Sequence, residues 1–387
     1  NTALLSDYFV KSTKKNSDGM ISNVICNSAK QGLIPQREYF DKDIANSDNT
    51  NGYYIIESND FVYNPRKSAD APYGPISSYQ YPEAGIVSPL YLCFRAKREI
   101  NPLYFEWYFR SSTWHRYIYM SGDSGARHDR VSIKDDVFFA MPINVPSAKE
   151  QEKISLFLDV IERRIETQRT LVETLKKYKR GVISALLSSK TNPYYSPETW
   201  KEVALCDVAS GFEYGMNAAA TVYDGSHKYI RITDIDDNSH LYSQDVPVSP
   251  EGQVDEKYRV RENDILFART GASVGKSYRY QRSDGDLYYA GFLIRIHVNS
   301  DVNCGYVFQN TLTEAYRRWV LLESARSGQP GINAEQYKQY RFLLPPLELQ
   351  NKISTLATNL DNLICKEENL LSQIEQVKIA LLQRLFI

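Results

Sequence analysis

Apolar residues along two long segments of the chain recur at alternating steps of four and three. The segments, 146–188 and 345–387, align at a constant shift of 199 residues without a gap. This spacing puts the apolar positions on one stripe of a helix and is typical of a coiled-coil seam. Each segment therefore predicts a helix of about 60 Å, at 1.5 Å per residue. The seam residues are Ile154, Leu158, Ile161, Ile165, Val172, Leu175, Val182 and Leu186 in the first segment and Ile353, Ala357, Leu360, Ile364, Leu371, Ile374, Leu381 and Leu385 in the second.

The two seams are also interrupted by polar residues at matching places. These are Gln168 with Glu367, and Lys179 with Lys378. Shared exceptions indicate a shared architecture more strongly than shared leucines do, because polar seam residues fix the register of a helix pair at some cost in stability. Ser147 and Glu150 predict a capping box at the start of the first helix. The alternative is two unrelated amphipathic helices on separate cores.

The segments that precede the two helices also match, more loosely. Short alternating apolar runs predict strands at 59–66 and 91–97 in the first half, and at 263–270 and 291–298 in the second. A helix is expected over 101–118 and again over 304–324. The layout is therefore a mixed domain, a long helix, a second mixed domain and a second long helix.

The stretch RTGASVGKS, residues 269–277, resembles a phosphate-binding loop. Such a loop needs four residues between its glycines and a helix directly after its Lys-Ser pair. Here Gly271 and Gly275 are separated by three residues, and the following residues predict a strand and a turn. We therefore interpret the stretch as a glycine-bent hairpin, which is either a solvated turn or a contact to phosphate or base.

The composition of the chain restricts which classes of binding partner and site are possible. The net charge of −1 gives no support to a strongly basic surface, and the five histidines and five cysteines have no metal-ligand spacing. No run of 18 apolar residues and no signal-peptide pattern occur, so a cytoplasmic protein without a membrane partner is expected. The 29 tyrosines against 15 phenylalanines favour either a recognition surface or filled sheet edges.

Together, these segments resemble the specificity subunit of type I restriction–modification systems. The resemblance rests on NDILFARTGASVGKS (263–277), GINAEQYKQYRFLLPPLELQNKI (331–353) and the helix ends KKYKRGVISALL (176–187) and KIALLQRLF (378–386). It covers essentially the whole chain, although the first half departs more, because MPINVPSAKEQ lacks the paired prolines of LPPLELQ.

The resemblance implies an α+β chain with two mixed α/β target recognition domains in tandem. Each domain is followed by a long helix, and the helices pair as an antiparallel coiled coil with pseudo-twofold symmetry. The expected segments are recognition domain 1 over 1–145, helix 1 over 146–190, recognition domain 2 over 191–344 and helix 2 over 345–387.

The same resemblance implies a non-catalytic subunit that reads a bipartite target in double-stranded DNA. Two methyltransferase subunits would dock on it, and two restriction or translocase subunits are a further possibility. S-adenosylmethionine, ATP and Mg²⁺ are expected in those partners, and no cofactor or metal in this chain. Two other classes stay open at this point: an adaptor that binds only protein, and an enzyme with an unrecognised site.

Candidate DNA contacts are residues in loops at equivalent places of the two halves. Arg and Lys suit phosphate and guanine, and Gln or Asn can pair with adenine. The alternative for each of these residues is that its side chain is solvated on the surface and does not contact DNA. The candidates are Arg66, Lys67, Arg127, His128, Arg130 and Lys134 in the first half and Arg269, Thr270, Lys276, Arg326, Gln329 and Asn333 in the second.

Candidate partner-binding residues are apolar residues that lie off the predicted seams. They would either help to bind the methyltransferase subunits or pack within the helix pair. They are Phe157, Leu171, Tyr178, Leu363 and Leu370.

Overall fold

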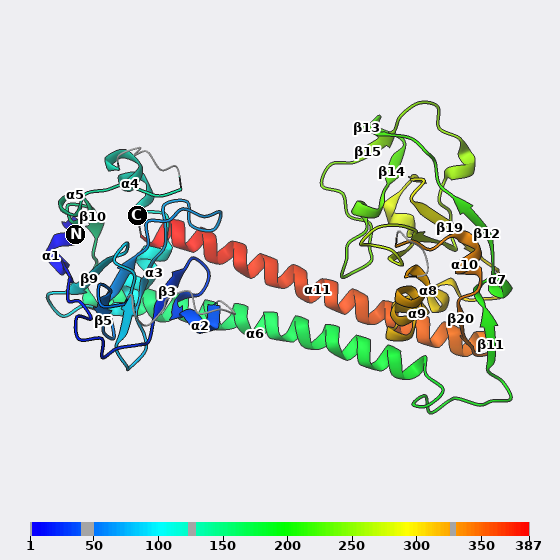
Figure 1. Cartoon of the computed structure of the whole chain (residues 1–387), viewed down its shortest axis with the longest axis horizontal. Helices are drawn as coiled ribbons and strands as arrows, with labels where there is room; N and C mark the ends of the chain where they lie inside the picture. The colour runs from blue at the N-terminus through cyan, green and yellow to red at the C-terminus, as the bar shows by residue number, and fades with distance from the viewer. Residues whose placement is uncertain (1, 40–49, 123–128, 326–329, 387) are drawn as a thin grey trace. The chain divides into compact units, whose positions relative to one another are not determined.

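The chain divides into two compact units, each with one globular domain and part of both long helices. Unit 1 comprises residues 1–169 and 369–387, and unit 2 comprises residues 170–368. The structure is a computed structural model that describes residues 2–39, 50–122, 129–325 and 330–386 (Figure 1). No helix in these described ranges is long and apolar enough to cross a membrane.

The domain of unit 1 is built around a four-stranded antiparallel sheet with the order β2-β9-β6-β7. A second pair, β1-β10, joins the beginning of the domain to the residues just before helix α6 (Ala148–Leu186). The elements of the domain are β1 Thr2–Leu4, α1 Leu5–Tyr8, β2 Phe9–Lys11, β3 Ile25–Ser28, β4 Gly32–Pro35, α2 Gln36–Tyr39, β5 Tyr54–Ile56, β6 Phe61–Tyr63, β7 Ile76–Ser78, β8 Gly85–Val87, β9 Leu92–Ala96, α3 Pro102–Arg110, α4 His115–Ser121, α5 Asp135–Phe139 and β10 Pro142–Asn144.

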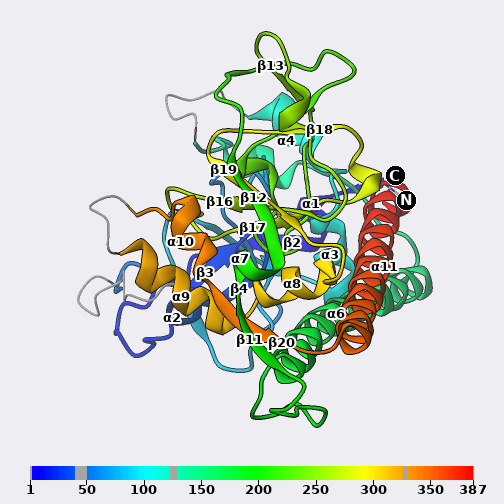
Figure 2. The same cartoon turned by 90° about the vertical axis from the view of Figure 1, so that its right-hand side faces the viewer.

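The domain of unit 2 repeats this plan. Its central sheet has the order β12-β19-β16-β17, and β11 pairs with β20 as β1 pairs with β10 (Figure 2). The domains differ in their smaller sheets, because β14 and β18 are parallel whereas β5 and β8 are antiparallel. The elements are β11 Lys201–Ala204, α7 Leu205–Val208, β12 Ala209–Tyr214, β13 Ala220–Val222, β14 Lys228–Ile230, η2 Ile232–Asp234, β15 Val248–Pro250, η3 Glu256–Tyr258, β16 Asp264–Ala268, β17 Ser277–Arg279, η4 Arg282–Asp284, β18 Leu287–Tyr289, β19 Leu293–Val298, α8 Cys304–Asn310, α9 Glu314–Ser324, α10 Ala334–Lys338 and β20 Arg341–Leu344.

Individual hydrogen bonds recur in both domains. The side chain of Asn101 accepts from the Tyr104 amide (3.1 Å), and the side chain of Asn303 accepts from the Tyr306 amide (2.9 Å). Both tyrosine hydroxyls then donate to a carbonyl of the strand before the long helix, at 2.8 Å and 2.6 Å respectively. The sequence repeat is therefore a repeat of detailed structure.

The expected single helices over 101–118 and 304–324 were wrong, because both are interrupted. Helix α3 ends at Arg110 and α4 begins at His115, whereas α8 ends at Asn310 and α9 begins at Glu314. Hydroxyl groups end the first helix of each pair: Ser111 donates to the Tyr108 carbonyl (2.6 Å), and Thr311 donates to the Phe308 carbonyl (2.7 Å). Side chains of this kind compete with the helical hydrogen bonds of the backbone, which the apolar pattern does not reveal.

The two long helices are confirmed. Helix α6 spans Ala148–Leu186 and α11 spans Leu347–Leu385, and the seam residues of both are buried or half-buried. The predicted capping box is present, since the Ser147 amide donates to the Glu150 carboxylate (3.0 Å) and the Glu150 amide donates to the Ser147 hydroxyl (3.4 Å). In each unit, the two helices run antiparallel.

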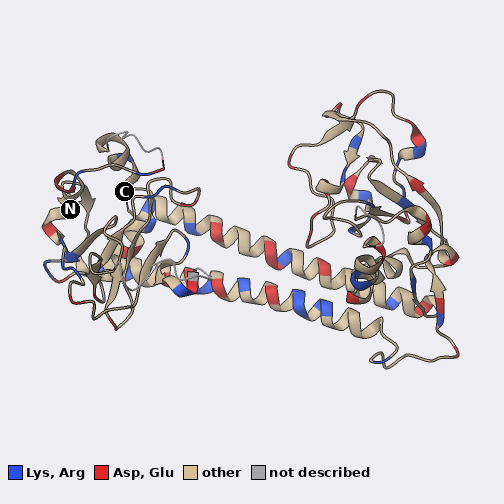
Figure 3. Ribbon diagram, in the orientation of Figure 1, with Lys and Arg blue, Asp and Glu red and all other residues tan. Residues whose placement is uncertain are grey.

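Four ion pairs between the helices fix the antiparallel register. In unit 1, Glu162 pairs with Lys378 and Arg169 with Glu375; in unit 2, Lys179 pairs with Asp361 and Lys176 with Glu368. The shift of 199 residues maps the pairs of one unit onto those of the other, with the charges of one pair reversed. The lysines that interrupt the two seams thus have equivalent carboxylate partners, and the charges of both signs are interspersed along both helices (Figure 3).

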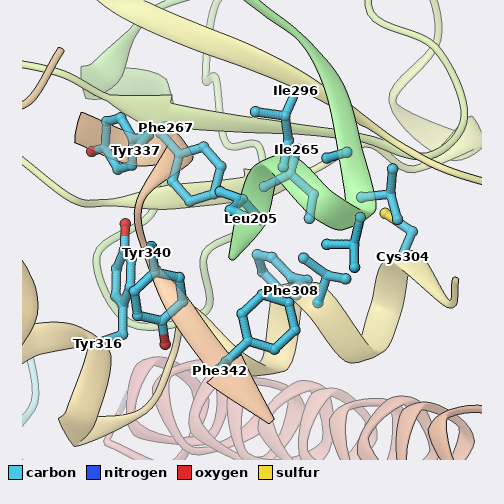
Figure 4. Packing of buried hydrophobic residues seen from close by; sticks show 14 of the residues in the cluster. Leu205, Ile265, Phe267, Ile296, Cys304, Phe308, Tyr316, Tyr337, Tyr340 and Phe342 are labelled. Atoms are coloured by element: carbon cyan, nitrogen blue, oxygen red, sulfur yellow. The ribbon is translucent and has the colours of Figure 1, made fainter. Parts of the chain in front are cut away.

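Aromatic residues form much of the core of each domain. In unit 2 the ring of Tyr337 lies 4.8 Å from that of Phe267, and Tyr316 and Tyr340 pack nearby (Figure 4). Several buried tyrosine hydroxyls donate to backbone carbonyls, as Tyr337 does to Ala268 (2.8 Å) and Tyr316 does to Gly275 (2.9 Å). Many of the 29 tyrosines therefore belong to the interior, where the ring packs and the hydroxyl fixes a loop.

Candidate nucleic-acid interface

The stretch 269–277 is a hairpin that joins β16 to β17, as predicted. The amide of Gly275 donates to the Ala268 carbonyl (2.9 Å), and the amide of Ala268 donates to the Lys276 carbonyl (2.8 Å). Gly271 and Gly275 have φ angles of 77° and 84°, which side chains other than glycine rarely adopt. A strand follows Lys276, so the helix N-terminus that a phosphate-binding loop requires is missing from this stretch.

Lys276 is engaged inside the domain. Its ammonium donates to the Ile235 carbonyl (2.9 Å) and forms an ion pair with Asp237, and the side chain is only 11% exposed. These contacts tie the hairpin to the residues after η2. The role that the structure supports for Lys276 is therefore to hold the hairpin in place.

Arg269 and Thr270 lie beside the loop that precedes α10. The Ile332 amide donates to the Arg269 carbonyl (2.9 Å), and Thr270 forms an isolated antiparallel bridge with Gly331. The guanidinium of Arg269 lies 4.9 Å from the centre of the Tyr214 ring, which is a cation–π contact. The hairpin and the loop before α10 thus form one surface region of unit 2, which we call edge 2 (residues 269–271 and 330–333).

Asn333 has a structural role in this region. Its side chain accepts from the Gln336 amide (2.9 Å), and the Gln336 side chain accepts from the Asn333 amide (2.9 Å), which forms a capping box at the start of α10. The residue is nevertheless exposed. The candidates Arg326 and Gln329 lie outside the described residues.

Unit 1 has the same arrangement. Arg66 forms an isolated antiparallel bridge with Arg130, and the Lys67 amide donates to the Asp129 carbonyl (2.9 Å). Arg66 and Lys67 are exposed and Arg130 is half-buried. We call this region edge 1 (residues 64–67 and 129–131). Lys134 is exposed at the position before the first residue of α5. Arg127 and His128 lie outside the described residues.

The strand that leads to each edge begins at a buried aspartate in unit 2 and directly after one in unit 1. Asp264 accepts from the Arg261 amide (2.8 Å) and lies 2.8 Å from the His297 ring nitrogen, and burial raises the pKa of its carboxyl group. In unit 1, Asp60 accepts from the Glu57 amide (2.8 Å) and from the Arg95 guanidinium (2.6 Å). Both aspartates shape the turn before a central strand. Among the described residues, no cluster of His, Cys, Asp and Glu could hold a metal ion.

Sequence reasoning missed Tyr214. Its ring lies against Arg269, and its hydroxyl accepts from the Ala334 amide (3.2 Å), so it supports both loops of edge 2. Tyr214 is the last residue of β12, and its side chain is 42% exposed. A single tyrosine at a strand end carries no signal in the sequence, because only the fold brings it to the loops.

Residues 197–376 match the family model described as the type I restriction modification DNA specificity domain. This segment, slightly under half of the chain, is therefore similar to a type I restriction–modification DNA specificity domain. The matched segment contains edge 2 completely, and the architecture repeats around edge 1. The resemblance drawn from the motifs is therefore confirmed.

Known proteins similar to this chain agree with that result. The type I restriction enzyme StySPI specificity subunit of Salmonella potsdam is 23% identical over 309 residues, which are 76% of this chain and 66% of that protein. The chain thus matches slightly under two thirds of that relative's length.

Two solved structures share the fold of this chain over its whole length. One comes from a study of complex assembly and conformational transition of the type I R-M system, with a TM-score of 0.62, 14% identity and coverage of 100% of this chain and 97% of that one. The other is the crystal structure of the S subunit of a type I restriction-modification system from M. genitalium, with a TM-score of 0.58, 12% identity and coverage of 100% and 96%. The expected fold, with tandem mixed domains each followed by a long helix, is confirmed.

The candidate partner-binding residues lie on the long helices and are accessible to solvent. Phe157, Leu171, Tyr178 and Leu363 are exposed, and Leu370 is half-buried. Apolar residues that are exposed or half-buried occur at equivalent places of the two helices. These pairs, 199 residues apart, are Phe157 with Leu356, Leu171 with Leu370, and Tyr178 with Val377.

Proposed function

We propose that this chain is the non-catalytic subunit that gives a type I restriction–modification complex its sequence specificity. Each globular domain reads one half of a bipartite target in double-stranded DNA, and the paired helices set the distance between the half-sites. The observation that carries the proposal is the repetition of one edge in both domains, where Arg66 bridges Arg130 and Thr270 bridges Gly331. One of these edges lies inside the matched specificity domain.

The two edges offer groups that suit DNA. Arg66 and Lys67 project from edge 1 as cations that can contact phosphate, and Arg269 of edge 2 can bind guanine in a bidentate manner. Tyr214 orients the guanidinium of Arg269 from below. Lys276 and Asn333 contribute indirectly, because they hold the loops on which the contacting residues sit.

Substituting Arg269 tests the DNA-reading role. If Arg269 binds guanine, Arg269→Ala costs about 1–3 kcal/mol of binding free energy and relaxes one position of the target. The matched control is Arg282→Ala, since Arg282 is an exposed arginine of the same unit that pairs with Glu262 instead. Binding is measured by titrating fluorescent duplexes into the assembled complex at several salt concentrations, because phosphate contacts give a steep salt dependence. Equal binding by both variants and the wild type would remove edge 2 from the DNA interface.

The partners of the proposed complex are two methyltransferase subunits, with restriction or translocase subunits as an optional further pair. Those partners would bring S-adenosylmethionine, ATP and Mg²⁺. Support comes from the repeated exposed apolar positions on α6 and α11, because a partner present in two copies needs two equivalent docking faces.

Charge at these positions tests the docking role. Leu171→Lys together with Leu370→Lys should reduce co-purification of the methyltransferase while the helices stay folded by circular dichroism. The matched control is Thr174→Lys on the same helix, which adds the charge without removing an apolar side chain. Unchanged stoichiometry in the double variant would show that these leucines pack only within the helix pair.

A further inference from the structure

Each domain carries one large apolar residue at the tip of a tight turn. In unit 1 the turn precedes β9, and Leu90 at its tip is 59% exposed. In unit 2 the turn precedes β19, and Phe292 at its tip is 61% exposed. Scattered exposed apolar side chains are normal on a protein surface, but these two stand at the same place of a repeated structure.

The equivalence of the two turns follows from their hydrogen bonds. The Tyr91 amide donates to the Ser88 carbonyl (3.0 Å), and the Leu293 amide donates to the Ala290 carbonyl (2.8 Å). Each bond links two residues that lie three positions apart along the chain. The tip residue, Leu90 or Phe292, lies between them, directly before the residue that donates the bond. Tips of tight turns favour Gly, Pro, Asn, Asp and Ser, so a large apolar residue at both tips runs against the chemistry of the turn itself.

The turn of unit 2 is held firmly. The Gly291 amide donates to the Met216 carbonyl (2.8 Å), and the Arg269 amide donates to the Phe292 carbonyl (3.1 Å). The neighbours Ala290 and Leu293 are buried, at 7% and 0% exposure. The backbone therefore fixes Phe292 with its ring in solvent.

Both tips lie beside the proposed DNA edges. The bond from Arg269 to Phe292 attaches the tip of unit 2 to edge 2. In unit 1, Tyr63 pairs with Leu92 in the central sheet. The turn before Leu92 therefore lies at the end of the sheet from which residues 64–67 leave.

We propose that Leu90 and Phe292 are apolar wedges that press against the base stack of the DNA half-site read by their own domain. This rests on the proposed function. Leucine and phenylalanine are among the residues that proteins insert between base steps, where they partly unstack the bases. The neighbouring Arg66, Lys67 and Arg269 would hold the backbone or a base edge while the wedge is in place. In the complex, DNA would cover these two apolar side chains.

The test uses the full chain assembled with its methyltransferase. The probes are duplexes that carry the bipartite target recovered by methylation sequencing, with 2-aminopurine placed in one half-site or the other, and a scrambled duplex of equal length. Phe292→Ala should weaken target binding about tenfold or more, in line with the cost of losing an aromatic–base contact. It should also abolish the rise in 2-aminopurine fluorescence in one half-site, and Leu90→Ala should do so only in the other. Phe292→Trp keeps a flat ring and should preserve both signals.

Matched controls separate the wedge from a general effect of exposed apolar groups. Val222→Ala and Met20→Ala remove side chains that are 90% and 81% exposed, one in each unit, and neither should change binding. Thermal unfolding midpoints close to wild type are expected for all five variants, because little surface is buried at these positions.

Three results would overturn the proposal. In the first, Phe292→Ala and Leu90→Ala bind and unstack the target as the wild type does. In the second, they lose the methyltransferase instead of DNA, which would make the tips protein contacts. In the third, the wild-type complex does not distinguish the target from the scrambled duplex, which would defeat the proposed function and the wedge with it.

Discussion

The two glycines of the hairpin 269–277 differ in what surrounds them. A Cβ atom on Gly275 would lie 2.6 Å from the side chain of Val320 on α9, whereas a Cβ on Gly271 would meet no atom within 4 Å. Both residues have positive φ angles. Gly275 is therefore required for backbone conformation and for close packing, and Gly271 only for conformation.

Gly275→Ala should lower the free energy of unfolding of unit 2 by more than the cost of the strained backbone alone, which is about 1–3 kcal/mol. Gly271→Ala is the matched control and should show only the backbone cost. Urea unfolding followed by tryptophan fluorescence measures both. Equal destabilisation by the two substitutions would contradict the packing role of Gly275.

Each unit contains a half-buried histidine whose titration should make the stability of that unit sensitive to acid. Burial lowers the pKa of His115 in unit 1 and of His240 in unit 2 below the ordinary value of 6.5. The unfolded chain therefore takes up a proton more readily than the folded chain does. The contribution to stability is complete above about pH 6.5 and is lost as the pH falls from there toward the lower folded-state values.

The His115 ring packs 4.6 Å from Trp114 and 4.9 Å from Tyr73, measured between ring centres. His115→Phe keeps an aromatic ring there and removes the titration. We expect a smaller loss of stability in the variant than in the wild type when the pH is lowered from about 7.5 to about 5.5. Urea unfolding at both pH values gives the comparison. Parallel losses in the two proteins would show that His115 does not contribute to acid sensitivity.

At the scale of elements, the register of the helix pair depends on charges that face each other. Lys179 is 16% exposed and pairs with Asp361 of the other helix, and Lys378 pairs with Glu162 in the equivalent way. Lysines are tolerated at these seam positions because the ammonium group of each one reaches a carboxylate at the edge of the seam. The carbon chain of the lysine can meanwhile lie along the apolar surface.

Lys179→Asp should destabilise unit 2 by up to about 1 kcal/mol, since it places two carboxylates opposite each other. Adding Asp361→Lys restores opposite charges and should recover most of the loss. Thermal unfolding at low and high salt measures both effects, and salt should reduce the difference. No recovery in the double variant would mean that the cost comes from lost packing of the lysine stem.

At the scale of the whole molecule, the shift of 199 residues relates the helices, their caps and their ion pairs. Gln151 donates to the Pro146 carbonyl (2.9 Å) and Gln350 donates to the Pro345 carbonyl (2.8 Å) at the two helix starts. Because the two helices begin with equivalent contacts, we expect that both can be lengthened together without disturbing either domain.

One heptad inserted into each helix, near Thr170 and near Asn369, keeps the seam in register. It lengthens the pair by about 10 Å, which corresponds to about three base pairs. The spacer of the methylated target should grow by that amount while both half-sites stay unchanged, with some loss of affinity because the half-sites rotate around the duplex. Methylation sequencing of cells that carry the double insertion gives the result. An unchanged spacer would show that the helices do not set the distance.

The sequence by itself determined the tandem layout, the two long helices and their seams, the capping box at Ser147 and the hairpin at 269–277. These features follow from periodicity and from local chemistry, which act between residues close along the chain. The apolar pattern of a long helix also repeats over many residues, so a single polar exception such as Lys179 does not hide the pattern.

Only the tertiary structure decided which residues share a surface. It placed Tyr214 under Arg269, engaged Lys276 with Asp237, and left Phe292 exposed directly before the buried Leu293. These outcomes depend on contacts between residues far apart along the chain. The sequence around a single lysine or phenylalanine is the same whether its side chain is bonded inside the fold or exposed to solvent, so the sequence does not distinguish the two cases. The breaks between α3 and α4 and between α8 and α9 also escaped prediction, because one hydroxyl that bonds to the backbone outweighs an apolar pattern that runs through it.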